Sequence, residues 1–148
     1  MTATTPTTSS ATTIPTERSS DPAAVASALA AHLERTWNQA DGAAFAAVFV
    51  GDSDFVDVRG MHHRGRPAIA AGHQGIFDGI YRGSTVRYTV DRARAVAPGC
   101  IVAIVSATLD APEGPLQGIN HARFTLTVTH DVHRWEIAAF QNTLIPRS

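Results

Sequence analysis

Few side chains of this sequence suit acid–base chemistry, and Asp57 is one that stands among apolar neighbours. It alternates with Phe55 in a segment typical of a β-strand, so both side chains belong to one strand face. If that face borders a cavity, burial raises the pKa of the carboxyl and permits proton transfer near neutral pH. A solvated carboxylate at a sheet edge is the alternative.

His73 is the second candidate, because it interrupts the apolar side of a predicted helix that opens at Arg66-Pro67. It would serve there as a general acid or base, or donate a hydrogen bond to a ligand carbonyl. A core histidine bonded to backbone is the alternative. Adjacent His62 and His63 point to opposite faces of a short strand, so only one of them can enter a pocket.

Apolar walls with a few orienting polar groups are typical of a small-molecule pocket. An amide on the last predicted strand can offer either its oxygen or its NH₂ group. Aromatic residues at regular spacing are otherwise ordinary core residues. The predicted ligand-binding residues are Trp37, Phe55, His63, Phe77, Tyr88, Phe140 and Asn142.

The composition excludes several kinds of chemistry. All 12 basic residues are arginine, which rules out a Schiff-base lysine, a pyridoxal-phosphate anchor and a P-loop lysine. His130 and His133 flank a predicted turn without a third ligand at suitable spacing, so we expect no metal. Gly72 to Gly75 lie within a helix and lack dinucleotide-binding spacing, so we expect no cofactor.

Length and charge favour one soluble domain. The chain has 148 residues, 44% of them apolar, and its net charge of −1 gives no positive field for nucleic acid or an anionic membrane. The single cysteine, Cys100, cannot form an intramolecular disulfide, which fits a reducing cytoplasm. No apolar run approaches the roughly 20 residues of a membrane span.

The predicted elements place three helices before a set of long strands. Residues 1–20 are rich in Thr, Ser, Ala and Pro and are predicted to form a disordered tail before a single domain over 21–148. A helix over 22–40 precedes a short helix that carries Phe45, Val48 and Phe49, and a third helix follows Arg66. Strands are predicted over 54–59, 84–97, 100–109, 119–130 and 134–145, with a short strand at His62 and His63.

This order predicts an α+β fold with an antiparallel sheet, because no βαβ alternation is present. Ile101 to Val105 are apolar at every position, as in a central strand covered on both faces. In the next strand Phe124 and its alternate neighbours are assigned to the core, and His121 and Arg123 to the opposite face. Gly72, Gly75 and Gly79 predict a close approach of another backbone to the third helix.

The order of elements resembles the cone-shaped fold of nuclear transport factor two and ketosteroid isomerase. Residues 54–60 (DFVDVRG), 64–73 (RGRPAIAAGH) and 135–143 (WEIAAFQNT) resemble the SgcJ/EcaC group of that SnoaL-like superfamily. Proteins of this group occur in actinobacterial antibiotic clusters, including those for enediyne polyketides. The resemblance spans residues 22–146. The group more often has Asn at the position of Asp57 and Trp at that of His63.

The resemblance implies a curved, mostly antiparallel sheet that the helices close into a conical cavity, usually in a homodimer. It also implies two functions. One is an accessory protein of polyketide biosynthesis that binds a hydrophobic intermediate and works beside polyketide biosynthetic enzymes. The other is a cofactor-independent isomerase, cyclase or dehydratase that uses Asp57 and His73. We favour binding, because no spacing here sets a base and an electrophilic stabiliser about 3 Å from one reacting atom.

Overall fold

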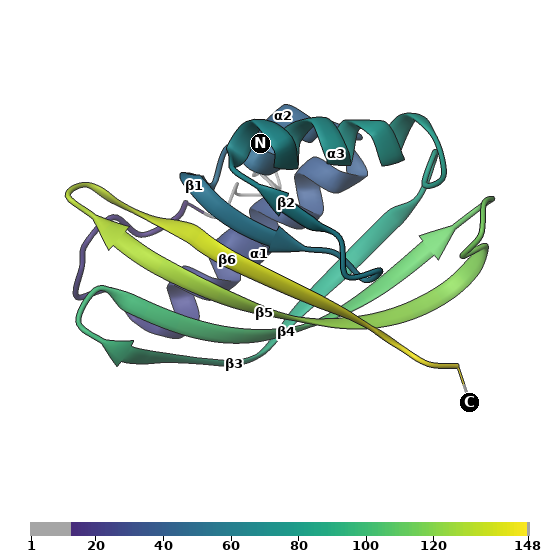
Figure 1. Ribbon diagram of the computed structural model, residues 1–148. Coiled ribbons are helices and arrows are strands. Elements are labelled where there is room, and N and C mark those ends of the chain that lie inside the picture. The colour runs from purple at the N-terminus through teal and green to yellow at the C-terminus, as the bar shows by residue number, and fades with distance from the viewer. Residues whose placement is uncertain (1–12, 148) are drawn as a thin grey trace, which may run out of the picture.

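The computed structural model describes residues 13–147 and shows three helices on the concave side of one curved sheet (Figure 1). The sheet has the order β2-β1-β6-β5-β4-β3, and every neighbouring pair is antiparallel except β1 with β6. The predicted α+β class and curved sheet are confirmed. The elements are α1 (Pro22–Asn38), α2 (Gly42–Ala46), β1 (Phe49–Val56), β2 (His62–Arg64), α3 (Arg66–Asp78), β3 (Thr85–Ala97), β4 (Cys100–Ala111), β5 (Gly118–Asp131) and β6 (Arg134–Ile145).

The first two helices are capped as the sequence predicts. The Asp21 carboxylate accepts a hydrogen bond from the N–H of Ala24, with Pro22 in the first turn of α1. α1 ends at Asn38, and the chain reverses at Ala40 with a φ of 54°. The Asp41 side chain then caps α2. The two helices therefore meet at a sharp corner.

The boundaries of β1 differ from the prediction at both ends. The strand begins at Phe49, which was expected to be helical, because it pairs in parallel with β6 and the N–H of Ile137 donates to Val48 O at 2.8 Å. The strand ends at Val56, before Asp57, because the chain turns there. Long-range strand pairing thus overrides the local apolar spacing that resembled a helix.

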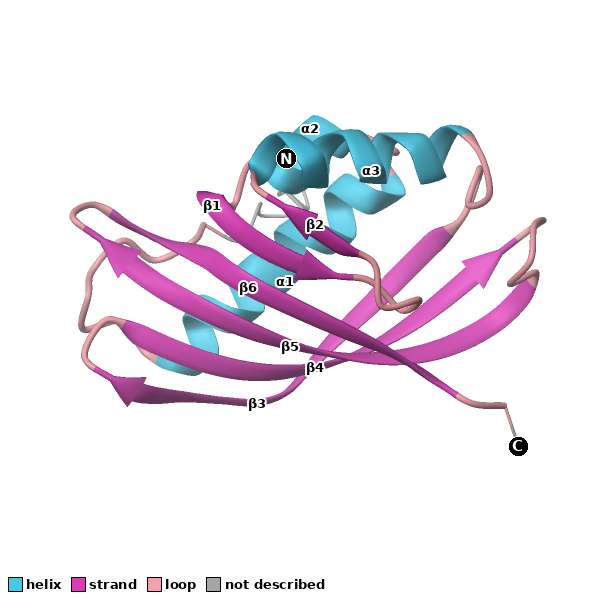
Figure 2. Cartoon of the chain, in the orientation of Figure 1, coloured by secondary structure: helices cyan, strands magenta, loops and turns pink. Residues whose placement is uncertain are grey.

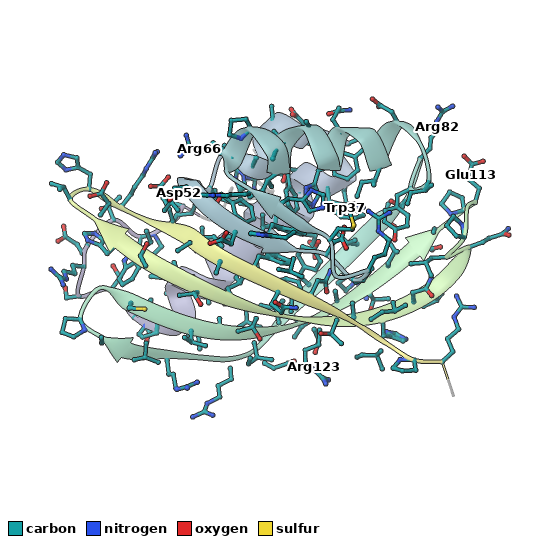
Figure 3. The ribbon with its side chains drawn as sticks, viewed as in Figure 1. Trp37, Asp52, Arg66, Arg82, Glu113 and Arg123 are labelled. Carbon is teal, nitrogen blue, oxygen red and sulfur yellow. The ribbon has the colours of Figure 1, made fainter. Side chains whose placement is uncertain are left out.

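The four long strands form a meander that makes up most of the sheet (Figure 2). Their concave face is buried against the helices, whereas Arg123 projects from the opposite face (Figure 3). The core is continuous from α1 to β6. Its largest fully buried side chains include Leu29, Leu33, Phe45, Phe49, Phe124, Leu126 and Ile137.

The close approach to α3 lies mainly at a glycine that the sequence analysis did not single out. A Cβ on Gly42 of α2 would lie 2.5 Å from the carbonyl oxygen of Ala70, whereas Gly75 has open space around it. Gly72 does have a close neighbour, the His63 ring of β2, at 3.1 Å from a built Cβ. Glycine therefore sets the distance of α3 from both α2 and β2.

Part of the predicted tail lies against the sheet. Residues 1–12 are outside the described residues, but Ile14 packs on the core and the indole N–H of Trp135 donates to Glu17 O at 2.9 Å. Arg18 donates to Pro98 O at 3.1 Å. None of the helices within residues 13–147 has both the length and the apolar character of a membrane span.

Candidate functional site

A cavity lies between the helices and the concave face of the sheet. Its empty volume is about 730 Å³, part of which is open to solvent, and its walls are mainly apolar. The space that the centre of a water molecule can occupy in it is about 100 Å³. Its lining comes from α1, α3 and all the long strands, and includes Trp37, Phe55, Asp57, His73, Tyr81, Val86, Tyr88, Ala107, Leu109, Asn120, Phe124, Asn142 and Leu144.

Stacked aromatic rings lie beside this cavity, and the outer two, Phe55 and Phe124, line it. The Phe140 ring lies between those of Phe55 and Phe124, with centroid distances of 4.2 and 4.3 Å and interplanar angles of 18°. Tyr88 meets Phe124 edge-on at 5.1 Å. β1, β6, β5 and β3 each contribute one ring, so sheet order and register build this cluster. Phe55, Phe124 and Tyr88 give this side of the cavity an aromatic lining.

His73 projects from α3 among these rings. It is 5% exposed, stacks on Phe45 with centroids 4.1 Å apart, and meets Phe55 edge-on at 4.8 Å. Its Nδ1 lies 2.8 Å from Ile69 O. Because a carbonyl oxygen can only accept, Nδ1 carries the proton, and Nε2 of the neutral ring is an acceptor. This tautomer differs from the predicted donation to a ligand carbonyl.

The pKa of His73 supports the neutral ring. Burial, which disfavours the charged form, outweighs the hydrogen bond to Ile69 and lowers the pKa from 6.5 to about 4. At neutral pH the side chain therefore holds one proton, on Nδ1. Such a ring accepts hydrogen bonds but is a poor proton donor.

Asp57 lies directly after β1, where its carboxylate organises a turn. It accepts hydrogen bonds from the N–H groups of Arg59 and Met61, from the Arg59 guanidinium at 3.0 Å and from His63 Nε2 at 3.0 Å. Burial alone would raise its pKa, but these hydrogen bonds together lower it from 3.8 to about 2. The predicted raised pKa is wrong, because the partly buried carboxylate accepts hydrogen bonds that stabilise its charged form more than burial destabilises it.

The other predicted ligand-binding residues divide into two groups. Trp37 lies between the helices and the sheet and lines the cavity (Figure 3), with its indole N–H donated to Ser84 Oγ at 3.0 Å. Phe55, Tyr88 and Asn142 line it as well. His63, Phe77 and Phe140 stand outside the lining and support it: His63 holds Asp57, Phe77 packs against Trp37 at 5.0 Å, and Phe140 joins the ring stack.

Two further lining residues carry polar groups on the concave side of the sheet. The amide oxygen of Asn142 is buried and has no hydrogen-bond partner among residues 13–147. Burial raises the pKa of the Tyr88 hydroxyl, and the nearby Glu34 carboxylate raises it further, so this group is un-ionised at neutral pH. Besides the Asp57–Arg59 ion pair, the cavity thus holds neutral polar groups in apolar surroundings.

Sequence reasoning missed part of the lining. Asn120 and Ala122 continue the alternation of Phe124, and Leu144 continues that of Asn142, so extending the inward face would have found them. Tyr81 lies in the turn after α3, where no periodicity marks it, and burial raises the pKa of its hydroxyl. Within residues 13–147 no group of three or more His, Cys, Asp or Glu side chains is arranged to hold a metal ion.

Known structures share this architecture. A protein from Caulobacter vibrioides with a cystatin-like fold is 30% identical, with a TM-score of 0.74 over 82% of this chain and 87% of that one. A domain of unknown function from Nostoc punctiforme, also cystatin-like, is 27% identical, with a TM-score of 0.74 over 81% and 75% of the two chains.

A more distant likeness concerns the fold alone. A ketosteroid isomerase-like protein from Erwinia carotovora atroseptica is 13% identical, with a TM-score of 0.69 over 82% of this chain and 94% of that one. Neither a scan against protein-family profiles nor a search of the curated proteins finds a match.

Proposed function

We propose that this chain, which belongs to the family of the Caulobacter vibrioides protein with a cystatin-like fold, binds an apolar small molecule in its conical cavity without transforming it. The single observation that carries the proposal is the cavity between the helices and the sheet, which is lined mainly by apolar and aromatic side chains and holds neutral polar groups beside the Asp57–Arg59 ion pair. Such a site provides buried apolar area for affinity and a few hydrogen bonds for orientation.

The protonation states of the two acid–base candidates favour binding over catalysis. General acid–base catalysis works best when a group titrates near the working pH. The pKa of Asp57 is about 2 and that of His73 about 4, so at neutral pH the first is a fully ionised carboxylate and the second a fully neutral ring. An isomerase, cyclase or dehydratase built on this pair would have a weak base and almost no acid.

The resemblance of residues 54–60, 64–73 and 135–143 to the SgcJ/EcaC group supports a more specific role. In this proposal the ligand is an intermediate of enediyne-type polyketide biosynthesis, held by a homodimer for the biosynthetic enzymes that act on it. The arrangement of neighbouring genes tests this part. Neighbours that encode no polyketide machinery would remove the pathway and leave the binding function in place.

Binding is tested by filling the cavity. Ala107 lines it from β4, whereas the next residue, Thr108, belongs to the opposite face of the same strand. We expect 1-methoxynaphthalene to bind the full chain in titration calorimetry, and Ala107→Phe to weaken that binding at least about tenfold by occupying the space. Thr108→Phe is the matched control and should change the affinity less than about twofold. No binding to the wild-type chain, or equal losses in both variants, would contradict the proposal.

A further inference from the structure

We infer that the ligand carries a hydroxyl group that donates a hydrogen bond to Nε2 of His73, so the cavity selects phenol-like or alcohol-bearing ring compounds over ethers and ketones of the same size. This inference rests on the proposed binding function and adds the chemical class of the ligand. The chemical class follows from which atoms of the buried polar side chains already have a hydrogen-bond partner within the chain.

The position of the proton on His73 decides what the ring can bind. Nδ1 must donate to Ile69 O, at 2.8 Å, because the carbonyl has no hydrogen to give. Nε2, on the other side of the ring, therefore presents a lone pair, and His73 is among the residues that line the cavity. A ligand carbonyl or ether oxygen would meet that lone pair with one of its own, whereas a hydroxyl would donate to it.

Asn142 provides a second observation in the same cavity. Its Oδ1 is buried without a hydrogen-bond partner within residues 13–147, and the side chain lines the cavity from β6. An unsatisfied buried oxygen is costly, and a nearby donor would remove that cost. Because Oδ1 of Asn142 is covered, the unbonded acceptor available to a ligand is Nε2 of His73, which favours a ligand that brings a donor. The aromatic lining of Phe55, Phe124 and Tyr88 favours a ring system as the carrier of that donor.

Two probes of nearly equal size distinguish the contribution of the hydroxyl group to the affinity from that of the ring system. We expect 1-naphthol to bind the full wild-type chain about fivefold more tightly than 1-methoxynaphthalene in titration calorimetry, the effect of one hydrogen bond to a buried acceptor. In His73→Phe, which keeps an aromatic ring beside Phe45, this preference should disappear, so that the ratio of the two affinities falls to about one. His62→Phe is the matched control on exposed β2 and should keep the preference.

A second measurement uses only wild-type protein, so its result does not depend on whether the His73→Phe variant folds. In wild-type protein labelled with ¹⁵N-histidine, the Nε2 resonance of His73 should be that of an unprotonated nitrogen and should shift with 1-naphthol but not with 1-methoxynaphthalene. Equal affinity for the two probes, a preference that survives His73→Phe, or a proton on Nε2 of the free protein would overturn the inference and leave the binding function standing. If neither probe binds, the binding function fails, and the inference fails with it.

Discussion

At the scale of single residues, both acid–base candidates lie at the cavity, but neither is in a state that suits proton transfer near neutral pH. His73 was expected among apolar neighbours, and its burial lowers its pKa as that setting requires. Asp57 was expected to gain a raised pKa. It lies where the chain turns, and its pKa is lowered by hydrogen bonds from the His63 ring, the Arg59 guanidinium and two backbone N–H groups, which alternation along a strand does not reveal.

Burial of His73 should make the protein less stable in acid. Its pKa is about 4 when folded and 6.5 when exposed, so between these values the unfolded chain binds the proton more readily. The free energy of unfolding should therefore fall as the pH drops from 6.5 to 4, by up to about 3 kcal/mol from this residue. Urea unfolding across this range should show the loss in wild-type protein and a smaller loss in His73→Phe. Parallel pH curves for the two proteins would contradict the assignment.

The Asp57 turn should be sensitive to the loss of its carboxylate. Asp57→Ala removes the acceptor of two backbone N–H groups and two side chains, and we expect a loss of about 1–3 kcal/mol in the free energy of unfolding. Asp54→Ala, which removes an exposed partner of His62, should cost less than about 1 kcal/mol. Chemical denaturation measures both, and equal losses would show that the turn does not depend on Asp57.

At the scale of elements, the strands with strong alternation and the capped first helix were predictable, whereas the start of β1 was not. Phe45, Val48 and Phe49 fit helical spacing, but Phe49 pairs with Ile137, a residue far away in the chain. A single sequence gives no information on that partner. The same limit explains the glycines of α3: the spacing of Gly72, Gly75 and Gly79 indicates small residues but not which of them meets a neighbour.

The space around each glycine predicts how much an alanine at that position changes the free energy of unfolding. Gly75→Ala should stabilise the protein by up to about 1 kcal/mol, because it gains helix propensity without contacts. Gly72→Ala should gain less, because its Cβ would lie 3.1 Å from the His63 ring. Gly42→Ala should destabilise strongly, because its Cβ would lie 2.5 Å from Ala70 O. Urea denaturation tests the order, and a Gly42→Ala protein as stable as wild type would contradict the packing of α2 on α3.

At the scale of the whole molecule, caps, helical spacing and strand alternation agreed with one another and predicted an α+β fold with an antiparallel sheet, whereas the curvature of that sheet was implied only by the resemblance. The cavity itself was predicted only through a resemblance. Its walls come from strands and helices whose distance from one another depends on packing across the whole chain, as the ring stack of Phe55, Phe140 and Phe124 shows.

The proposed homodimer makes a prediction about the convex face of the sheet. Val102 and Ile104 of β4, the strand next to the edge strand β3, lie on that face and alternate with the buried Ile101, Ala103 and Val105, so the predicted cover on both faces of a central strand is wrong. Light scattering of the full chain at micromolar concentration should give twice the monomer mass, and Ile104→Arg should give the monomer. A wild-type chain that is monomeric under these conditions would contradict the dimer.

The one parallel pair, β1 with β6, has a consequence for the order of folding. Each of the strands β3 to β6 pairs with the strand next to it in the chain across a short turn, so these pairs can form early in folding. Of these four strands β1 pairs only with β6, which is far away from it in the sequence. β1 is also the strand that brings Phe55 to the aromatic lining and leads into the Asp57 turn. Before β1 pairs with β6, the sheet of β3 to β6 therefore lacks one side of the cavity. A ligand can be enclosed only after β6 has been synthesised.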